Sequence, residues 1–149
     1  MALTAFRTWT TGELVTAALL NTQIRDNGNV FVPGGWTFVI DGGGAVITTG
    51  SKVWAEMPMA ACLQAVTMVT VEGSSLELGI IKNTYANWGS APSPLYGSSP
   101  LRASSAKTAQ ITTLTTWSVS LAQGDWIGAC IRGASGDTKA FVGVRFNRT

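Results

Sequence analysis

The stretch Gln64-Ala-Val-Thr-Met-Val-Thr-Val-Glu72 decides the fold class of this 149-residue chain. Successive side chains of a β-strand point to opposite faces, so residues two apart share a face. The two faces of the stretch carry Val66, Met68 and Thr70, and Ala65, Thr67, Val69 and Val71. Because valine and threonine are β-branched and favour the pleated backbone, the stretch predicts a β-strand.

Similar short runs recur on both sides of this strand, and glycine, asparagine and aspartate separate them. They cover residues 36–40, 45–48, 52–57, 76–82, 109–114, 117–121, 126–132 and 139–146. The polar, proline-containing stretch 87–99 is expected to be a loop. About eight or nine short strands with closely spaced turns predict an all-β, antiparallel sandwich or jelly roll. No helical pattern lies between them, which argues against a parallel α/β sheet.

The N-terminal segment has a different pattern. Thr16 is a suitable N-cap, and Ala17, Leu20 and Ile24 follow at helical spacing, with Leu19 beside them. Asn27-Gly28 supplies the stop. We therefore expect an arm and one short helix in residues 1–34, followed by a β-sandwich in residues 35–149.

This short helix needs a surface on which to pack. A helix of about ten residues is not stable alone in water. Leaving a large apolar side chain in water forfeits roughly 1.5–3 kcal/mol. The side chains expected to anchor the segment on a neighbour are Phe6, Trp9, Leu14, Leu19, Leu20 and Ile24. For Phe6 and Trp9, packing on the chain's own body is an equally good interpretation.

The composition favours assembly over chemistry. Charged residues make up 12% of the chain, where about 25% is usual, so partners or small polar residues are expected to cover much of the surface. No cluster of Lys or Arg indicates nucleic acid. No apolar run is long enough to span a membrane, and the first residues lack a secretory pattern, so we expect maturation in a cytoplasm.

No catalytic, cofactor-binding or metal site is predicted. The chain has no histidine, which removes the commonest general base and metal ligand. Stretch 44–52 departs from the phosphate-loop pattern in both its spacing and its residues. No two carboxylates have a spacing that implies a glycosidase pair, although the fold could bring a pair together. Asp125, after a glycine, is expected to form a turn.

Aromatic and cysteine residues leave alternatives open. Packing in the core is the default expectation for Trp36, Trp54, Trp117 and Trp126. Tyr85, Trp88 and Tyr96 lie in or beside the proline-containing loop, where they would contact a sugar or be buried against a neighbouring subunit. Cys62 and Cys130 lie in apolar runs and are read as small buried hydrophobes, with a disulfide as the other possibility.

The N-terminal segment also resembles a known group of proteins. The run Gly12-Glu-Leu-Val-Thr-Ala-Ala18, followed by Leu20-Asn21 and Ile24-Arg-Asp-Asn27, is similar to the opening of many tailed-phage virion proteins.

The body resembles the small β-sandwich modules of phage structural proteins and trimeric jelly rolls of the tumour-necrosis-factor type. The matching stretches are Ile47-Thr-Thr-Gly-Ser-Lys52 leading to Met57-Pro58, Glu72-Gly-Ser74 leading to Ile81-Lys-Asn83, and Leu121-Ala-Gln-Gly-Asp-Trp126.

The resemblance implies a non-enzymatic virion component, a homotrimer assembled in the host cytoplasm. The favoured role is a capsid decoration (cement) protein, with the major capsid protein or another virion protein as partner. The N-terminal arm would attach it to that partner. The alternative role is a tail-fibre or receptor-binding module that contacts carbohydrate on the host surface.

Overall fold

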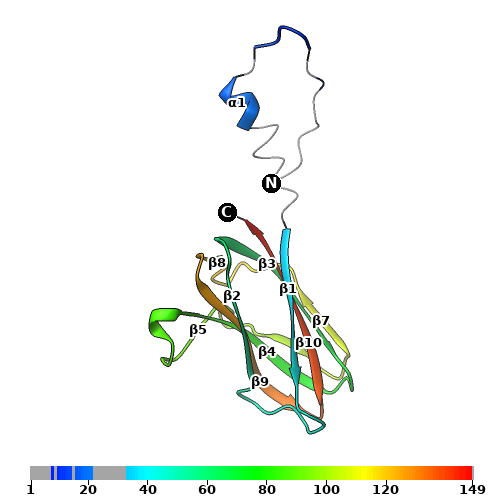
Figure 1. Ribbon diagram of the computed structural model, residues 1–149. Coiled ribbons are helices and arrows are strands. Elements are labelled where there is room, and N and C mark those ends of the chain that lie inside the picture. The colour runs from blue at the N-terminus through cyan, green and yellow to red at the C-terminus, as the bar shows by residue number, and fades with distance from the viewer. Residues whose placement is uncertain (1–7, 9, 15, 22–32, 149) are drawn as a thin grey trace.

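The computed structural model describes residues 8, 10–14, 16–21 and 33–148, and these form an antiparallel β-sandwich with one short helix (Figure 1). Sheet A contains β1 (Pro33–Asp41), β10 (Lys139–Arg148), β3 (Ala61–Thr70) and β7 (Thr108–Ile111), with β8 (Ser120–Leu121) also paired to β3. Sheet B contains β2 (Lys52–Glu56), β9 (Asp125–Ser135), β4 (Ser75–Thr84) and β5 (Ser93–Pro94), with β6 (Leu101–Ala103) also paired to β4. The predicted all-β sandwich is confirmed.

The order of pairing is that of a jelly roll. Strands of the first half pair antiparallel with strands of the second half in reverse order: β1 with β10, β2 with β9, β3 with β7 and β8, and β4 with β5 and β6. The chain therefore behaves as a long hairpin that is wrapped into two sheets. Strand β1 begins at Pro33, slightly before the boundary at residue 35 that the sequence suggests.

The core lies between the two sheets, and it is formed by alternate side chains of their strands. On β3, Val66 and Met68 are almost fully buried, whereas Val69 on the opposite face is 46% exposed. The central strands of sheet B contribute Leu78, Ile80 and the other inward side chains to the same cluster. Burying each such side chain contributes roughly 1.5–3 kcal/mol to the folded state.

Residues 45–48 do not form the predicted strand. Gly43 and Gly44 adopt positive φ angles of 65° and 88°, and the chain crosses here from sheet A to sheet B. The amide of Ile47 donates to the carbonyl of Asp137 at 2.8 Å, so this apolar residue is buried without joining a ladder. The apolar character of residues 45–48 thus reflects the burial of Ile47 beneath the connection between β1 and β2.

The N-terminal helix α1 covers Ala17–Leu20. The hydroxyl of Thr16 accepts a hydrogen bond from the Leu19 amide at 3.2 Å, which confirms the predicted N-cap. None of the α1 residues is buried, and Figure 1 shows the helix apart from the sandwich. The predicted continuation through Ile24 and the stop at residues 27–28 lie outside the described residues.

Both cysteines are free thiols. Cys130 is buried on β9, in sheet B, and Cys62 is half-buried on β3, in sheet A. The disulfide, which was the less favoured alternative, is therefore not formed; the interpretation as a small buried hydrophobe is confirmed for Cys130, whereas Cys62 is only partly buried.

Candidate functional site

The outer face of sheet B carries an aromatic surface that the β9 pattern sets up. Ile127, Ala129 and Ile131 are fully buried in the core, so the intervening side chains of β9 face outward. The outward positions begin with Trp126 and Gly128. On β2, Trp54 lies directly opposite Gly128 in the register.

The absence of a side chain at Gly128 allows Trp54 to lie against the sheet. A Cβ atom built on this glycine would lie 2.7 Å from Cε3 of Trp54 and 2.9 Å from its Cδ2. Any larger residue would push the indole outward. The glycine therefore fixes the height of the Trp54 ring above the strands.

Trp88 completes the aromatic surface from a turn that follows β4. Trp88 directly follows the 3₁₀ turn η2 (Tyr85–Asn87). The centroid of the Trp88 ring lies 5.3 Å from that of Trp54 and 5.1 Å from that of Trp126. The Trp54–Trp88 pair has an interplanar angle of 63°, the edge-to-face geometry that aromatic pairs prefer, and the Trp88–Trp126 pair is tilted at 60°. We call Trp54, Trp88 and Trp126 the tryptophan cluster.

Hydrogen bonds hold the turn in place beneath Trp88. The Trp88 amide donates to the carbonyl of Tyr85 at 3.2 Å, and the Ser90 amide donates to the carbonyl of Asn87 at 3.0 Å. The side-chain amide of Asn83, at the end of β4, donates to the same Asn87 carbonyl at 3.3 Å. The position of Trp88 is thus tied to sheet B.

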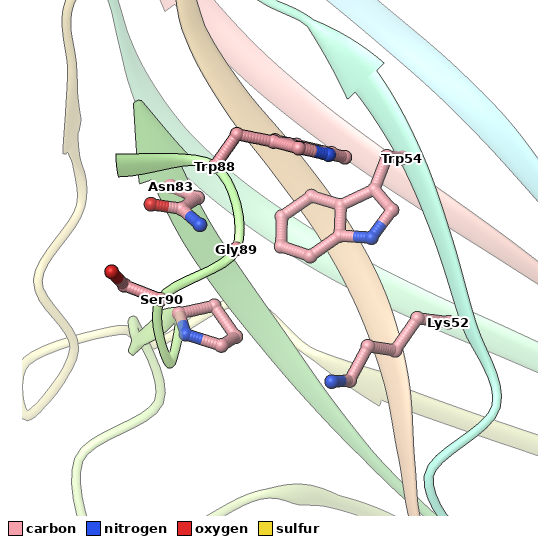
Figure 2. A pocket seen from close by; sticks show the side chains of 7 residues that line it. Lys52, Trp54, Asn83, Trp88, Gly89 and Ser90 are labelled. Carbon is pink, nitrogen blue, oxygen red and sulfur yellow. The ribbon is translucent and has the colours of Figure 1, made fainter. Parts of the chain in front are cut away.

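A shallow cleft of about 230 Å³ adjoins the tryptophan cluster (Figure 2). It is lined by Lys52, Trp54, Asn83, Trp88, Gly89, Ser90 and Pro92. In Figure 2 the Trp54 ring projects between Trp88 and Lys52, while the Asn83 amide approaches from the opposite side. We call this space the Trp54 cleft.

A second cleft, of about 320 Å³, shares Lys52 and Pro92 with the first. Its lining comprises Lys52, Ile81, Ala91, Pro92, Pro94, Tyr96, Cys130 and Arg132. We call it the Arg132 cleft, because the Arg132 guanidinium lies 5.8 Å from the centroid of the Tyr96 ring inside it. Shared lining makes the two clefts parts of one groove along sheet B.

The aromatic residues predicted from the loop are not all placed as expected. Tyr85 is 81% exposed and Trp88 is 53% exposed, whereas Tyr96 is buried. Tyr96 folds down because Gly79 leaves room for it: a Cβ built on Gly79 would lie 2.3 Å from Cε1 of the tyrosine. The expectation that Tyr96 is an exposed loop aromatic is therefore wrong, although its ring still lines the Arg132 cleft.

Two of the four tryptophans expected in the core contribute to this surface, and one of them, Trp54, also packs against the core cluster. Trp54 and Trp126 are only partly buried and pack around Trp88. Trp117 is buried as expected, and Trp36 packs at the core boundary against Phe146. The position of Trp54 opposite Gly128 would have indicated that it belongs to the site. This position is known only from the register of β2 and β9.

Of the predicted anchor residues, three lie in the described part of the chain. Leu14 is 80% exposed, Leu20 is 40% exposed and Leu19 is partly buried. Phe6, Trp9 and Ile24 lie outside the described residues. The described anchor side chains thus present apolar surface that the sandwich does not cover.

Two buried aspartates make structural contacts. Asp125 accepts from the Ala122 amide at 2.8 Å and pairs with Lys82 at 3.2 Å, so it closes a turn as expected, although through an amide that precedes it. Asp137 accepts from the amides of Gly73 and Ser74 at 3.1 and 3.4 Å.

Two exposed carboxyls are held in their ionised form. Hydrogen bonds from the hydroxyl and then the amide of Thr138 hold the pKa of Glu72 below its usual value. The Lys139 ammonium, which lies 2.8 Å away, and the Gly43 amide hold the pKa of Asp41 below its usual value. Among the described residues, no carboxylate lines the Trp54 cleft or the Arg132 cleft.

The groove has the chemistry of a binding surface for a ligand with both apolar and polar faces. Indole rings stack on the C–H face of a sugar, and amide, ammonium and hydroxyl groups bond to its hydroxyls. Within the described ranges, no three cysteine or carboxylate side chains lie close enough together to hold a metal ion. In the same part of the chain, no helix has the length and apolar character needed to cross a membrane.

Neither a protein-family model nor a curated protein matches the chain. Among solved structures, the catalytic unit of a thermostable GH87 alpha-1,3-glucanase from Streptomyces thermodiastaticus strain HF3-3 is similar, with a TM-score of 0.39 and 14% identity. The match covers 76% of this chain and 26% of the glucanase chain. A likeness at this TM-score carries no argument about activity.

Proposed function

We propose that this chain is a non-enzymatic structural protein of a tailed-phage virion, whose jelly roll binds carbohydrate through the groove on sheet B. The observation that carries the binding role is the tryptophan cluster. Its rings lie 5.1–5.3 Å apart around Trp88, which remains 53% exposed. An indole ring that remains partly in water beside a cleft lined by Lys52, Asn83 and Ser90 offers an apolar face for stacking on a sugar.

The virion part of the proposal is supported by the N-terminal resemblance and by the exposed side chains near α1. Leu14 and Leu20 gain a place to pack if the segment docks on a larger particle. The sequence favoured capsid decoration over a receptor-binding role. We favour the receptor-binding role instead, because exposed aromatic rings beside a cleft suit the binding of a ligand, which a cement protein does not need.

Assembly into a trimer, which the sequence resemblance implies, is supported by a different observation. On the outer face of sheet A, Val39, Phe141 and Val69 are aligned across β1, β10 and β3, and they are 46%, 38% and 46% exposed. A row of three apolar side chains is suited to contact between copies of the chain. Self-association through sheet A and sugar binding through sheet B are compatible.

The binding role is tested by screening the full chain against an array of bacterial surface glycans. We expect wild type to bind a subset of glycans and Trp88→Ala to lose them. Tyr85→Ala is the matched control, since Tyr85 lies on the same turn but does not line either cleft. Equal binding by Trp88→Ala and wild type would contradict the proposed site.

A further inference from the structure

The groove on sheet B contains positive charge that no acidic side chain of the described residues balances. Lys52 lines both clefts, and Arg132 lines the second. Neither forms an ion pair with a described residue. By contrast, Lys82, Arg102 and Lys139 pair with Asp125, Glu77 and Asp41, in that order.

The strand register places these two cations on the same face and close together. Lys52 lies directly opposite Cys130, and Arg132 is two positions further along β9. Neighbouring strands are about 4.8 Å apart, and two residues of a strand span roughly 6.6 Å. One anionic group can therefore contact both side chains, which are long and flexible.

Each cation is suited to an anion in a different way. The Arg132 guanidinium lies 5.8 Å from the Tyr96 centroid, and the buried ring limits its orientations. A guanidinium forms two parallel hydrogen bonds to a carboxylate or a phosphate. Lys52 adds a point charge at the junction of the two clefts, beside Trp54.

Two neighbouring cations are unusual in a chain with so few charged residues. Ten basic and eight acidic residues are spread over 149 positions, and no described carboxylate lines either cleft. Two like charges on adjacent strands repel each other, and a bound anion removes that repulsion. The arrangement is therefore stabilised by an anionic ligand.

We propose that the groove takes an acidic saccharide, with a sugar ring in the Trp54 cleft against Trp54 and Trp88. Its carboxylate or phosphate lies between Lys52 and Arg132. This inference rests on the proposed carbohydrate-binding function and specifies the class of glycan. The shared chemistry is a sugar that carries an anion, from either a uronic-acid polymer or a phosphate-linked wall polymer.

The test is a fluorescence titration of the full chain with three probes, at low and moderate salt. The probes are tetragalacturonate, glucose-substituted poly(glycerol phosphate) and the neutral maltotetraose. We expect at least one acidic probe to bind roughly 10-fold to 100-fold more tightly than the neutral probe, with weaker binding at higher salt. The tighter of the two acidic probes identifies the source of the anion.

Substitutions distinguish the contribution of the two cations to binding from that of the Trp88 ring. Lys52→Gln combined with Arg132→Gln is expected to remove the preference for acidic probes. Arg145→Gln, which removes from β10 in sheet A a cation that forms no ion pair with a described carboxylate, should leave the preference intact. Trp88→Ala should weaken the binding of every probe.

The outcomes distinguish this inference from the function on which it rests. Equal affinity for neutral and acidic probes, unchanged in the Lys52→Gln/Arg132→Gln variant, would overturn the inference and leave carbohydrate binding standing. Loss of the preference in Arg145→Gln as well would also overturn it, since the effect would then be one of overall charge. No binding of any probe would contradict both.

Discussion

The indole ring of Trp54 lies over the backbone of Gly128 on the neighbouring strand, where a Cβ atom would come within 2.7 Å of Cε3 of the ring. This contact connects the packing of sheet B to the geometry of the groove. Trp88 rests against Trp54 with its centroid 5.3 Å away, so a displaced Trp54 also disturbs Trp88. A residue with no side chain thus sets the shape of the candidate site.

Gly128→Ala is expected to displace Trp54 and weaken glycan binding. The new methyl group would also meet the Val53 carbonyl at 2.9 Å, so a loss of about 1–3 kcal/mol in the free energy of unfolding is expected. Gly133→Ala, on the same strand, is the control, because its Cβ would make an ordinary 3.6 Å contact with Glu77. Urea unfolding and glycan titration of both variants measure the effect; equal behaviour would show that Gly128 is not the support of Trp54.

Stability at low pH is expected to depend on Glu72. Hydrogen bonds from Thr138 hold the pKa of this carboxyl below the 4.5 of a free glutamate. The stabilisation is therefore complete above about pH 4.5 and is lost as the pH falls through the lower pKa of the folded state. Glu72→Gln should be less stable than wild type at pH 7 and lose less stability between about pH 5 and pH 3.

The measurement is the free energy of unfolding in urea at pH 7, 5 and 3. Thr138→Val provides a second comparison, since it removes the hydroxyl donor but retains the amide that bonds to Glu72 at 2.9 Å. It is expected to reduce the acid dependence only in part. If the Glu72→Gln and wild-type curves run parallel across the range, the carboxyl does not contribute in this way.

Self-association is expected to depend on the apolar row of sheet A. The full chain should sediment as an oligomer, with a trimer as the proposed state, and Phe141→Glu should sediment as a monomer. Val46→Glu is the matched control: Val46 is 48% exposed but lies in the connection between β1 and β2. A monomeric wild type, or an unchanged Phe141→Glu oligomer, would contradict a role for this face.

Removing residues 1–27 is expected to separate attachment from folding. The jelly roll contains its own core, so the truncated chain should retain its β-sheet circular dichroism spectrum and a cooperative unfolding transition. It should no longer attach to particles that lack the native protein. Full occupancy of such particles by the truncated chain would show that the N-terminal segment is not the anchor.

The sequence predicted those parts of the fold that depend on local pattern. The alternation in residues 64–72 predicted the strand β3 but not which of its two faces points into the core, and Thr16 caps α1 as its hydroxyl chemistry suggests. Residues 45–48 were assigned to a strand in error, because an apolar residue buried beneath a connection has the same composition as a short strand. The sequence did not predict β6, because its 3 residues are too few to show an alternating pattern of apolar and polar side chains.

The candidate site depended on contacts between distant parts of the chain. Whether Trp54 faces the core or the solvent depends on its pairing with Gly128, about 70 residues away, and no local pattern encodes that register. Tyr96 likewise appeared to be a loop aromatic until Gly79, on β4, provided space for its ring. Trp88 alone could be selected from the sequence, because its loop position and its exposure agree.

The proposed function depends on the binding of a sugar ring by the exposed face of Trp88. The most direct test is the dissociation constant of one glycan, taken from the array, for wild type, Trp88→Ala and Trp88→Tyr. We expect binding to be lost in Trp88→Ala and largely restored in Trp88→Tyr, since a tyrosine ring retains a stacking face. Unchanged affinity in Trp88→Ala, with the variant folded, would contradict it.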